Sequence, residues 1–401
     1  MTENPVHRSK RVRRRFHLRR WILYGLPGLG ALIYVVVRVY VPMTLLKDAI
    51  ASSEKSLYQA EKLVTQAIEQ AGGSYPEAEV FRAQLYAASG RGDEALGQFS
   101  LIKSPERLPA KQLIDLGLVA MKNQESLLAE KAFLSVSSES EHYPSVLRSL
   151  IQIHLQMGRD DTAKSECGLL LELEPNDPTV WQILGTIALN RKELAEAEEA
   201  FRMCLRHSKD AQQLRDTRED LIQILIDQGN VAEARKELSV LAKVSGEFSS
   251  RAIIEDAYVH RMEGNQKKGI ELLNALADRD DAFQVRVLFL RGLLYADSGQ
   301  DKEAAADLAA VAKRQPWHKE AHHKLSVILA KLGNKELADA HRRKADELTD
   351  LALELLNAST ELAKNPSSST LRSRVAFLYD QLGQPEQARR IQNLRQSPES
   401  Q

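Results

Sequence analysis

Residues 181–201, WQILGTIALNRKELAEAEEAF, predict two helices joined at LNRKEL, because apolar residues recur at spacings of three and four rather than two. Each helix carries a small residue, Gly185 or Ala197, where a core helix normally bears a large one. With Trp181 as position 4, these are positions 8 and 20, and Phe201 is position 24. Small residues there allow antiparallel helices to approach to the short end of the ~8 to 10 Å range. We expect small residues to form the helix hairpin and large ones to fill the space between hairpins.

The pattern repeats every 34 residues. Positions 4, 7, 8, 20 and 24 of the two preceding units hold mostly apolar or small residues, namely Leu147, Leu150, Ile151, Ala163 and Cys167, and Leu113, Leu116, Gly117, Ala129 and Phe133. A third shift reaches Tyr86, Gly90, Ala95 and Phe99. The inter-helix turn continues at Gly158, Gly229, Gly264, Gly299, Gly333 and Gly383, and the small position 20 at Ala234, Ala304, Ala338 and Ala388. The departures are Gly269 in place of alanine, and Arg342 and Gln392 in place of the aromatic residue.

This spacing resembles the tetratricopeptide repeat family, whose unit is a 34-residue helix-turn-helix. The resemblance covers roughly residues 76–395. It implies an all-α fold, a right-handed superhelical solenoid of about eight to nine antiparallel helix pairs with a concave face. The low aromatic content, 5% of the residues, suits such an Ala- and Leu-rich chain.

A basic, then apolar, amino terminus predicts one transmembrane helix before the solenoid. Eight Lys and Arg residues face one acid, Glu3, in residues 1–20, and an apolar stretch follows over residues 21–46. The charge asymmetry predicts a single-pass protein of the cell inner membrane, with a cytoplasmic amino terminus and periplasmic repeats. Two alternatives stay open: cleavage after Ala51, and export through the twin-arginine-like RRRFHL of residues 13–18.

The expected organisation has seven segments. They are a basic cytoplasmic arm (1–20), a transmembrane signal anchor (21–46), a lead-in or capping helix (47–75), repeat units 1–4 (76–211), units 5–8 (215–352), an extended helix with a degenerate repeat or cap (353–395) and a disordered tail (396–401).

The sequence offers little chemistry. Cys167 and Cys204 occupy inward second-helix positions and are interpreted as buried hydrophobes, with a disulfide as the alternative. The WHKEAHH stretch places His318, Glu320, His322 and His323 near one another, with His341 on the paired helix; a metal site is the alternative to a solvated first turn. Phosphate loops and hydrolase motifs are absent from the sequence. We predict no catalytic residues, no cofactor and no metal.

A peptide groove is the candidate site. In the family, first-helix positions 2, 5, 9 and 12 line the concave face; here the resemblance assigns Arg148, Gln152, Gln182, Thr186, Glu219 and Gln223, flanked by Ile114, Leu118, Tyr258 and Phe289. Amide side chains can bond an extended peptide backbone in either direction. The alternative is that these are ordinary polar surface positions. The basic clamp of chaperone-binding repeat proteins is absent, because Val80, Gln84, Ile114, Leu118, Arg148 and Gln152 stand at its positions.

The leading functional hypothesis is a non-catalytic, membrane-anchored scaffold that binds a protein or peptide partner in envelope assembly, secretion or quality control. Two alternatives are an accessory subunit of a membrane enzyme or export complex acting through residues 21–46, and a self-assembling structural repeat protein. A nucleic-acid partner is not expected, because the positive charge is confined to the amino-terminal arm. The repeat pattern identifies neither the partner nor the oligomeric state.

Overall fold

The computed structural model describes residues 34–245, 248–276 and 283–393, and these residues form helices and connecting turns without strands. The chain divides between Leu173 and Glu174 into two compact units. Unit 1 contains the π-helix η1 (Val36–Tyr40), α2 (Val41–Ser53), α3 (Leu57–Gln70), α4 (Pro76–Ala88), α5 (Gly92–Ser100), the 3-10 helix η2 (Pro105–Arg107), α6 (Ala110–Lys122), α7 (Ser126–Leu134), α8 (Tyr143–Gln156) and α9 (Asp160–Leu173).

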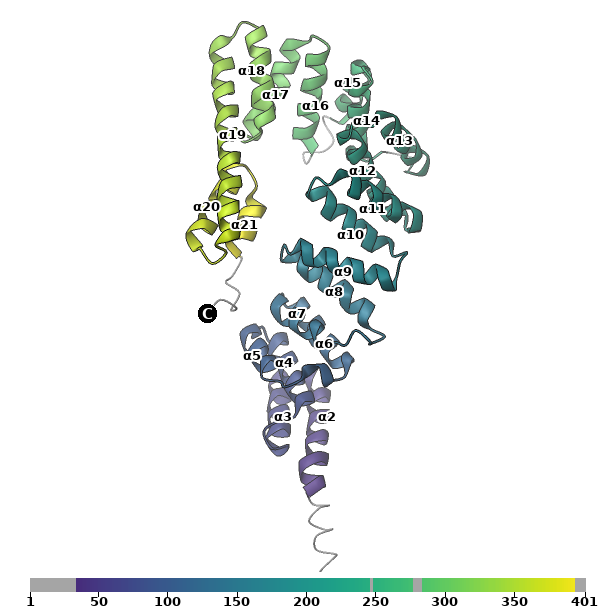
Figure 1. The fold of residues 1–401 in the computed structure, drawn as a ribbon, viewed down its shortest axis with the longest axis vertical. Coiled ribbons are helices and arrows are strands. Elements are labelled where there is room, and N and C mark those ends of the chain that lie inside the picture. Colours follow the sequence, from purple (N-terminus) through teal and green to yellow (C-terminus); the bar gives the residue numbers. More distant parts are fainter. Residues whose placement is uncertain (1–33, 246–247, 277–282, 394–401) are drawn as a thin grey trace, which may run out of the picture. The chain divides into compact units, whose positions relative to one another are not determined.

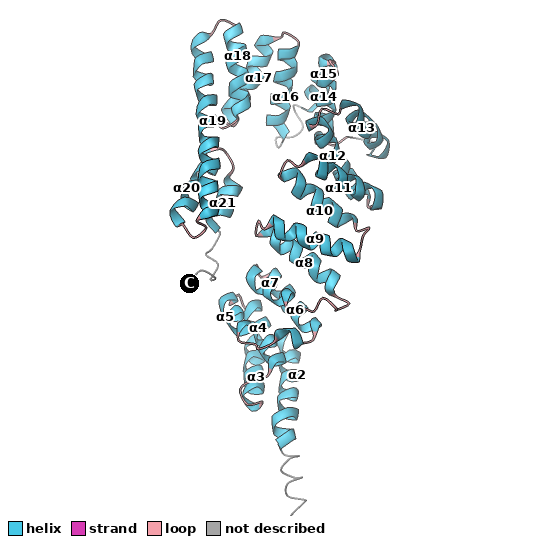
Figure 2. Cartoon of the chain, in the orientation of Figure 1, coloured by secondary structure: helices cyan, strands magenta, loops and turns pink. Residues whose placement is uncertain are grey.

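Unit 2 contains the remaining helices. These are α10 (Pro178–Asn190), α11 (Leu194–His207), α12 (Ala211–Asp227), α13 (Val231–Ser245), α14 (Ser250–Met262), α15 (Gln266–Leu276), α16 (Gln284–Asp297), α17 (Asp301–Arg314), α18 (Lys319–Lys331), α19 (Lys335–Lys364), α20 (Ser369–Gln381) and α21 (Pro385–Asn393). Figure 2 shows them as helices joined by short turns.

Helices pack in sequential pairs in both units, as Figure 1 shows. The pairs are α2–α3, α4–α5, α6–α7 and α8–α9 in unit 1, and α10–α11, α12–α13, α14–α15, α16–α17, α18–α19 and α20–α21 in unit 2. Apolar clusters bridge neighbouring pairs, so the core grows by addition along each unit. The all-α prediction is confirmed for the described residues.

Glycines at position 8 receive a large side chain from the paired helix. A Cβ atom added at Gly185 would lie 2.5 Å from the ring of Phe201, and one added at Gly117 would lie 2.6 Å from the ring of Phe133. The repeat pattern predicts that position 24 fills the space between hairpins. The structure instead places Phe201 inside its own hairpin. Because Gly185 has no side chain, the Phe201 ring can pack directly against the α10 backbone there.

The inter-helix turns need a left-handed residue at position 15. Gly158 (φ 70°) and Gly229 (φ 76°) supply it at little steric cost. In the two units without a glycine there, Gln124 (φ 63°) and Lys192 (φ 61°) adopt the same conformation. The turn geometry is therefore kept even where the residue type does not favour it.

The amino-terminal end requires a correction. In the described part of the chain no helix is long and apolar enough to cross a membrane. Residues 41–46, counted in the expected span, begin α2, where Leu46 packs in a buried cluster with Ala60 and Val64 of α3. The first helix pair thus accounts for the apolar residues Pro42 and Leu46, whereas Met43 is exposed.

This finding contradicts the predicted location, a single-pass inner-membrane protein with periplasmic repeats. The basic arm and residues 21–33 of the expected span lie outside the described residues.

Candidate functional site

The first helices of unit 2 carry six of the eight predicted groove residues. Gln182 and Thr186 lie on α10, Glu219 and Gln223 on α12, Tyr258 on α14 and Phe289 on α16. Of these, Thr186 is exposed, Gln182, Gln223, Tyr258 and Phe289 are half-buried, and Glu219 is buried. Arg148 and Gln152 are exposed on α8 in unit 1. We therefore describe the six unit 2 residues by themselves, and call the surface they form the first-helix face.

Amide side chains link neighbouring first helices across this face. Gln213 Nε2 of α12 donates to Gln182 Oε1 of α10 at 3.1 Å. Gln223 Nε2 donates to Asp227 Oδ1 at 3.0 Å, and Gln223 Oε1 accepts from Arg286 of α16 at 3.3 Å. The first of these bonds joins consecutive helix pairs, the second lies within α12, and the third joins α12 to α16. The half-buried amides thus fix the spacing of the first helices while part of each remains at the surface.

A largely buried network of charged residues joins α12 and α14 beneath the first-helix face. Arg251 of α14 bonds Asp220 of α12 at 2.7 Å and Glu255, one turn along α14, at 3.0 Å. Glu219 accepts a bond of 2.6 Å from the Ser249 hydroxyl, which also caps the amino terminus of α14. These bonds hold α12 against α14, and they explain why Glu219 is buried.

Glu255 is the most strongly perturbed carboxyl of the network. Its side chain is fully buried, and burial raises its pKa to about 8 against the opposing effect of Arg251. Its Oε2 atom has no hydrogen-bond partner among the described residues. Burial likewise raises the pKa of Asp220, which the Arg251 charge opposes. Glu255 is therefore protonated at neutral pH.

The apolar part of the face lies on α14 and α16. Tyr258 packs against two buried clusters, and burial raises the pKa of its hydroxyl. Phe289 packs on the His318 ring, with centroids 4.7 Å apart. Tyr258 lies near Arg286, an exposed cation on α16, the helix that also carries Phe289.

The repeat pattern did not assign Asp220, Arg251, Glu255 or Arg286 to the site. The i, i+4 spacing of Arg251 and Glu255 was a usable signal for an ion pair on one helix face. The bond from Arg286 to Gln223, 63 residues away, had no such signal.

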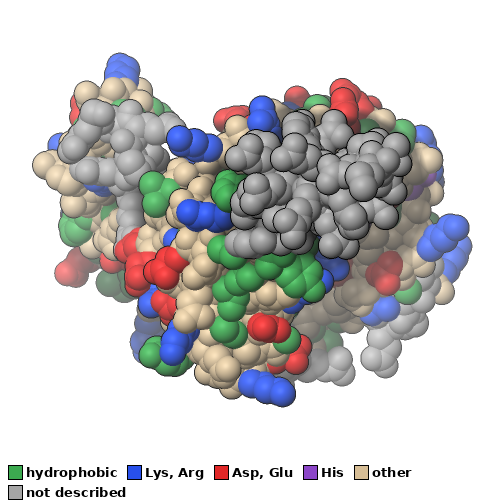
Figure 3. All heavy atoms as spheres, turned by 90° about the horizontal axis from the view of Figure 1, so that it is seen from below, with side chains coloured by type: hydrophobic (Ala, Val, Ile, Leu, Met, Phe, Trp, Pro, Cys, Tyr) green, Lys and Arg blue, Asp and Glu red, His purple; other side chains and the backbone are tan. Residues whose placement is uncertain are grey.

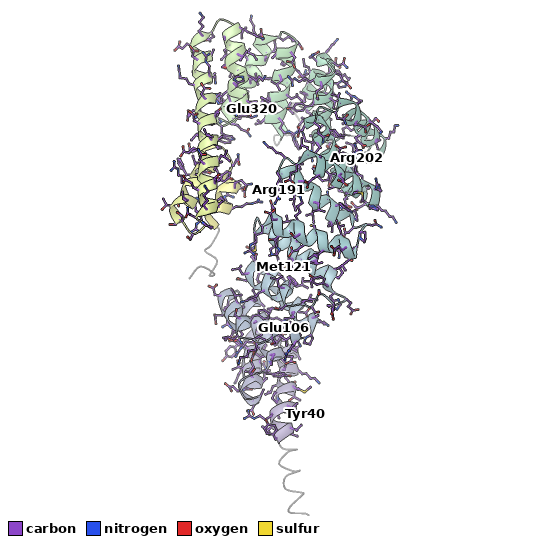
Figure 4. The ribbon with its side chains drawn as sticks, in the orientation of Figure 1. Tyr40, Glu106, Met121, Arg191, Arg202 and Glu320 are labelled. Carbon is purple, nitrogen blue, oxygen red and sulfur yellow. The ribbon has the colours of Figure 1, made fainter. Side chains whose placement is uncertain are left out.

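The second helices carry their own ion pairs. Arg202 of α11, labelled in Figure 4, bonds Glu198 at 2.9 Å and approaches Glu237 of α13 at 4.0 Å. Arg218 of the first helix α12 bonds Glu237 of α13 at 3.1 Å. Glu237 thus has cationic partners on both α11 and α12.

Cys167 and Cys204 are buried thiols, each within a helix core. The Cys204 thiol lies 3.4 Å from the Thr217 hydroxyl. The structure thus supports the interpretation of both as small buried hydrophobes.

The histidines of WHKEAHH do not converge. His318 accepts the Ala321 amide at the start of α18, whereas His322 is buried and faces His341 of α19, with 2.9 Å between their Nδ1 atoms. His323 is exposed. Within the described residues no group of three or more His, Cys, Asp or Glu side chains is arranged to hold a metal ion.

The His322–His341 pair predicts acid sensitivity. His322 Nε2 donates to the Pro316 carbonyl at 3.2 Å, so its Nδ1 must accept from His341. Burial lowers the pKa of both, and His318 and Lys344 lower that of His322 further. At these two histidines the unfolded chain therefore binds more protons, and their contribution to the free energy of unfolding should fall as pH drops below about 6.5.

Urea titrations between pH 5 and pH 8 test this prediction. His322→Gln should flatten the pH dependence, whereas the matched change His323→Gln on the exposed side of α18 should leave it unchanged. Equal slopes in all three proteins would show that the pair does not couple to stability.

Comparisons with known proteins agree with the fold. A family model described as a domain of unknown function (DUF7017) matches residues 149–252, which is less than half of the chain. No curated protein matches this chain. A tetratricopeptide repeat protein from Parabacteroides merdae is 16% identical, with 69% of this chain and 98% of that chain covered and a TM-score of 0.50. At this identity the likeness shows a tetratricopeptide-like helical repeat fold and nothing further.

Two other solved structures match with lower scores. MamA from Desulfovibrio magneticus RS-1 is 18% identical over 43% of this chain and 95% of its own, with a TM-score of 0.36. A structure of Naa15/Naa10 bound to HypK-THB is 13% identical over 90% of this chain and 69% of that chain, with a TM-score of 0.43. Scores this low carry no argument about function.

Proposed function

We propose that this protein is a non-catalytic scaffold whose first-helix face binds an extended segment of a partner protein. The tetratricopeptide-like repeat fold suggests a protein-interaction scaffold, and the comparisons give no evidence for an enzyme family. The observation that carries the proposal is the combination, on adjacent first helices, of half-exposed amides with the apolar side chains Tyr258 and Phe289.

The face also favours a particular peptide chemistry. The charge of Arg251 beneath it is compensated by Asp220, which it bonds at 2.7 Å. Arg286 is exposed, and it donates a hydrogen bond of 3.3 Å to the neutral amide of Gln223. An acidic side chain in the ligand would form a stronger, charge-assisted bond with this guanidinium. We propose an extended peptide with an acidic residue near Arg286 and an apolar residue near Tyr258 and Phe289.

Peptide selection with the full chain tests the proposal. Peptides captured from a random display library should contain an acidic residue beside an apolar one, and Arg286→Glu should weaken their binding about tenfold, the effect of losing ~1.4 kcal/mol. Lys236→Glu, a charge reversal at an exposed position on α13, is the matched control and should leave affinity unchanged. Failure to capture any peptide, or equal losses in both variants, would overturn it.

A further inference from the structure

His154 is a buried polar residue at a position where two neighbouring units have alanine. It lies at position 11 near the end of α8, and Ala120 and Ala188 occupy that position in the units before and after it. Its side chain is 2% exposed, whereas on the face seen in Figure 3 the side chains of Lys, Arg, Asp and Glu stand at the surface. A polar ring buried in this way costs free energy unless both of its nitrogens have partners.

Both ring nitrogens of His154 face a carboxyl group. Nδ1 lies 2.8 Å from Oε2 of Glu166 on α9, and Nε2 lies 3.2 Å from Oε1 of Glu130 on α7. The side chains of Glu166 and Glu130 are themselves only 10% and 17% exposed. Figure 1 shows α7, α8 and α9 following one another within unit 1. Since Glu130 belongs to the pair α6–α7 and Glu166 to the pair α8–α9, the His154 ring connects two helix pairs.

These contacts require a proton that a neutral histidine between two carboxylates lacks. An ionised carboxylate only accepts hydrogen bonds, and a neutral imidazole has a single N–H group. Two arrangements satisfy the geometry: a cationic His154 donates to both carboxylates, or a protonated Glu166 donates to Nδ1 while Nε2 donates to Glu130. Burial raises the pKa of Glu166, with the His154 ring acting in the opposite direction and Glu130 in the same one. In either arrangement the three side chains hold one extra proton and titrate together.

The charge balance of the cluster depends on the same proton. Arg159, in the turn before α9, donates through Nη1 to the Oε1 atom of Glu130 at 2.7 Å, so the charge of Glu130 is matched. With the extra proton, His154 and Glu166 sum to zero, as an ion pair or as two neutral groups. Without it, an unmatched negative charge stays in a largely buried site, and one ring nitrogen faces a carboxylate oxygen with no hydrogen between them. Both effects oppose the closed arrangement.

We propose that Glu130, His154 and Glu166 form a proton-dependent joint between the helix pairs α6–α7 and α8–α9. The joint is tight while the cluster holds its extra proton and loosens when that proton leaves. Phe133 of α7 and Leu150 of α8 share an apolar cluster that spans the same junction, so the pairs stay in contact after the proton is lost. The joint lies in unit 1 and the first-helix face in unit 2, so either proposal can fail without the other.

The joint acts on a surface of unit 1. First-helix positions of the two pairs that it connects hold Ile114 and Leu118 of α6, and Arg148 and Gln152 of α8. Leu118, Arg148 and Gln152 are exposed, and Ile114 is half-buried. A loosened joint changes the spacing of α6 and α8 and therefore the distance between these side chains. Proton loss thus alters any binding surface that the two first helices share.

Hydrogen–deuterium exchange of the full chain at about pH 6.5 and about pH 9 tests the proposal. An opened cluster releases its extra proton above about pH 6.5, the ordinary pKa of histidine, so each pH unit favours opening by up to about tenfold. Protection factors, which correct for the pH dependence of unstructured exchange, should fall at least about tenfold in α7, α8 and α9. Those in α4 and α5 of the same unit should change little. Equal protection in α7–α9 at the two pH values, or an equal fall in α4 and α5, rules out the joint.

Glu166→Gln separates the role of the proton from that of packing. Its amide donates to Nδ1 of a neutral His154, Nε2 still donates to Glu130, and no extra proton is needed. This variant should therefore keep at about pH 9 the protection that the wild type shows at about pH 6.5. Glu172→Gln, at an exposed glutamate on the same helix, should retain the wild-type pH dependence. A Glu166→Gln protein whose α7–α9 protection still falls with pH contradicts the joint, whereas one that does not fold leaves the wild-type comparison decisive.

Discussion

Gly185→Leu is expected to destabilise the protein by about 3 kcal/mol or more, the upper range for overpacking a filled core. A Cβ atom at this position would already lie 2.5 Å from the Phe201 ring, and both residues are buried between α10 and α11. The ring cannot rotate away, because it belongs to the cluster that joins this pair to α12 and α13. The two helices must separate or the ring must leave the core. Urea unfolding followed by far-ultraviolet circular dichroism measures the loss.

Two further variants make this result specific. Gly168→Leu on α9 adds the same side chain at a helical glycine with no neighbouring atom within 4 Å of the added Cβ. It should be neutral or stabilising by up to about 1 kcal/mol, because leucine favours a helix over glycine. Phe201→Ala should cost less in the Gly185→Leu background than alone, with a coupling of about 2 kcal/mol. If Gly185→Leu behaves like Gly168→Leu, position 8 does not set the hairpin geometry.

Glu255→Gln is expected to remove a large pH dependence of stability. The pKa of Glu255 is about 8 in the folded protein, above its ordinary value of 4.5. Through that window the folded state holds a proton that the unfolded state has released. The contribution of Glu255 to the free energy of unfolding should therefore fall as pH rises from about 4.5 to 8, by the order of 4 kcal/mol. The His322–His341 pair acts in the opposite direction below about pH 6.5, so the effect of Glu255 is read as the difference between the wild type and Glu255→Gln. Above pH 8 the carboxylate is ionised, with Glu219 nearby and a partnerless Oε2 atom.

The glutamine variant should be more stable than the wild type at pH 9 and similar to it at pH 5. An amide cannot ionise, and it keeps an oxygen that accepts from Arg251, whose other bond to Asp220 remains. Urea midpoints at intervals of one pH unit measure the slope. Glu271→Gln, at an exposed glutamate of the next helix, should retain the wild-type slope. A wild-type slope in Glu255→Gln would mean that this carboxyl is ionised in the folded state.

The repeat architecture was predictable because it is periodic. Small residues at positions 8 and 20 and glycine at position 15 recur in most units, every 34 residues in the first four, and pattern alone places them on helices and turns. The partner of each small residue was not predictable to the same degree. From the sequence, Phe201 could pack either inside its own hairpin or against the next one. The structure shows that its ring packs over Gly185 of its own hairpin, a contact that the sequence pattern does not reveal.

The amino terminus shows where composition misleads. Residues 41–46 are apolar enough to extend a hydropathy window, yet Leu46 is buried by α3 in a helix pair. A window average does not distinguish an apolar residue that faces lipid from one that faces another helix.

The first-helix face was only partly predictable. The family register assigned Gln182 and Gln223 to first-helix positions, and both are half-exposed there. It also assigned Glu219 to such a position, but Glu219 is buried and accepts a hydrogen bond from Ser249, which precedes α14. Ser249 precedes the repeated positions, so no periodic signal pointed to it.

Hydrogen–deuterium exchange of the full chain with and without a selected peptide tests the central claim most directly, because it reports which helices bind. Since the amides and aromatic residues lie on first helices, we expect slower exchange in α10, α12, α14 and α16 and unchanged exchange in α11, α13 and α15. Protection confined to these second helices, or no protection at peptide concentrations that saturate binding, would contradict a scaffold that binds through its first-helix face.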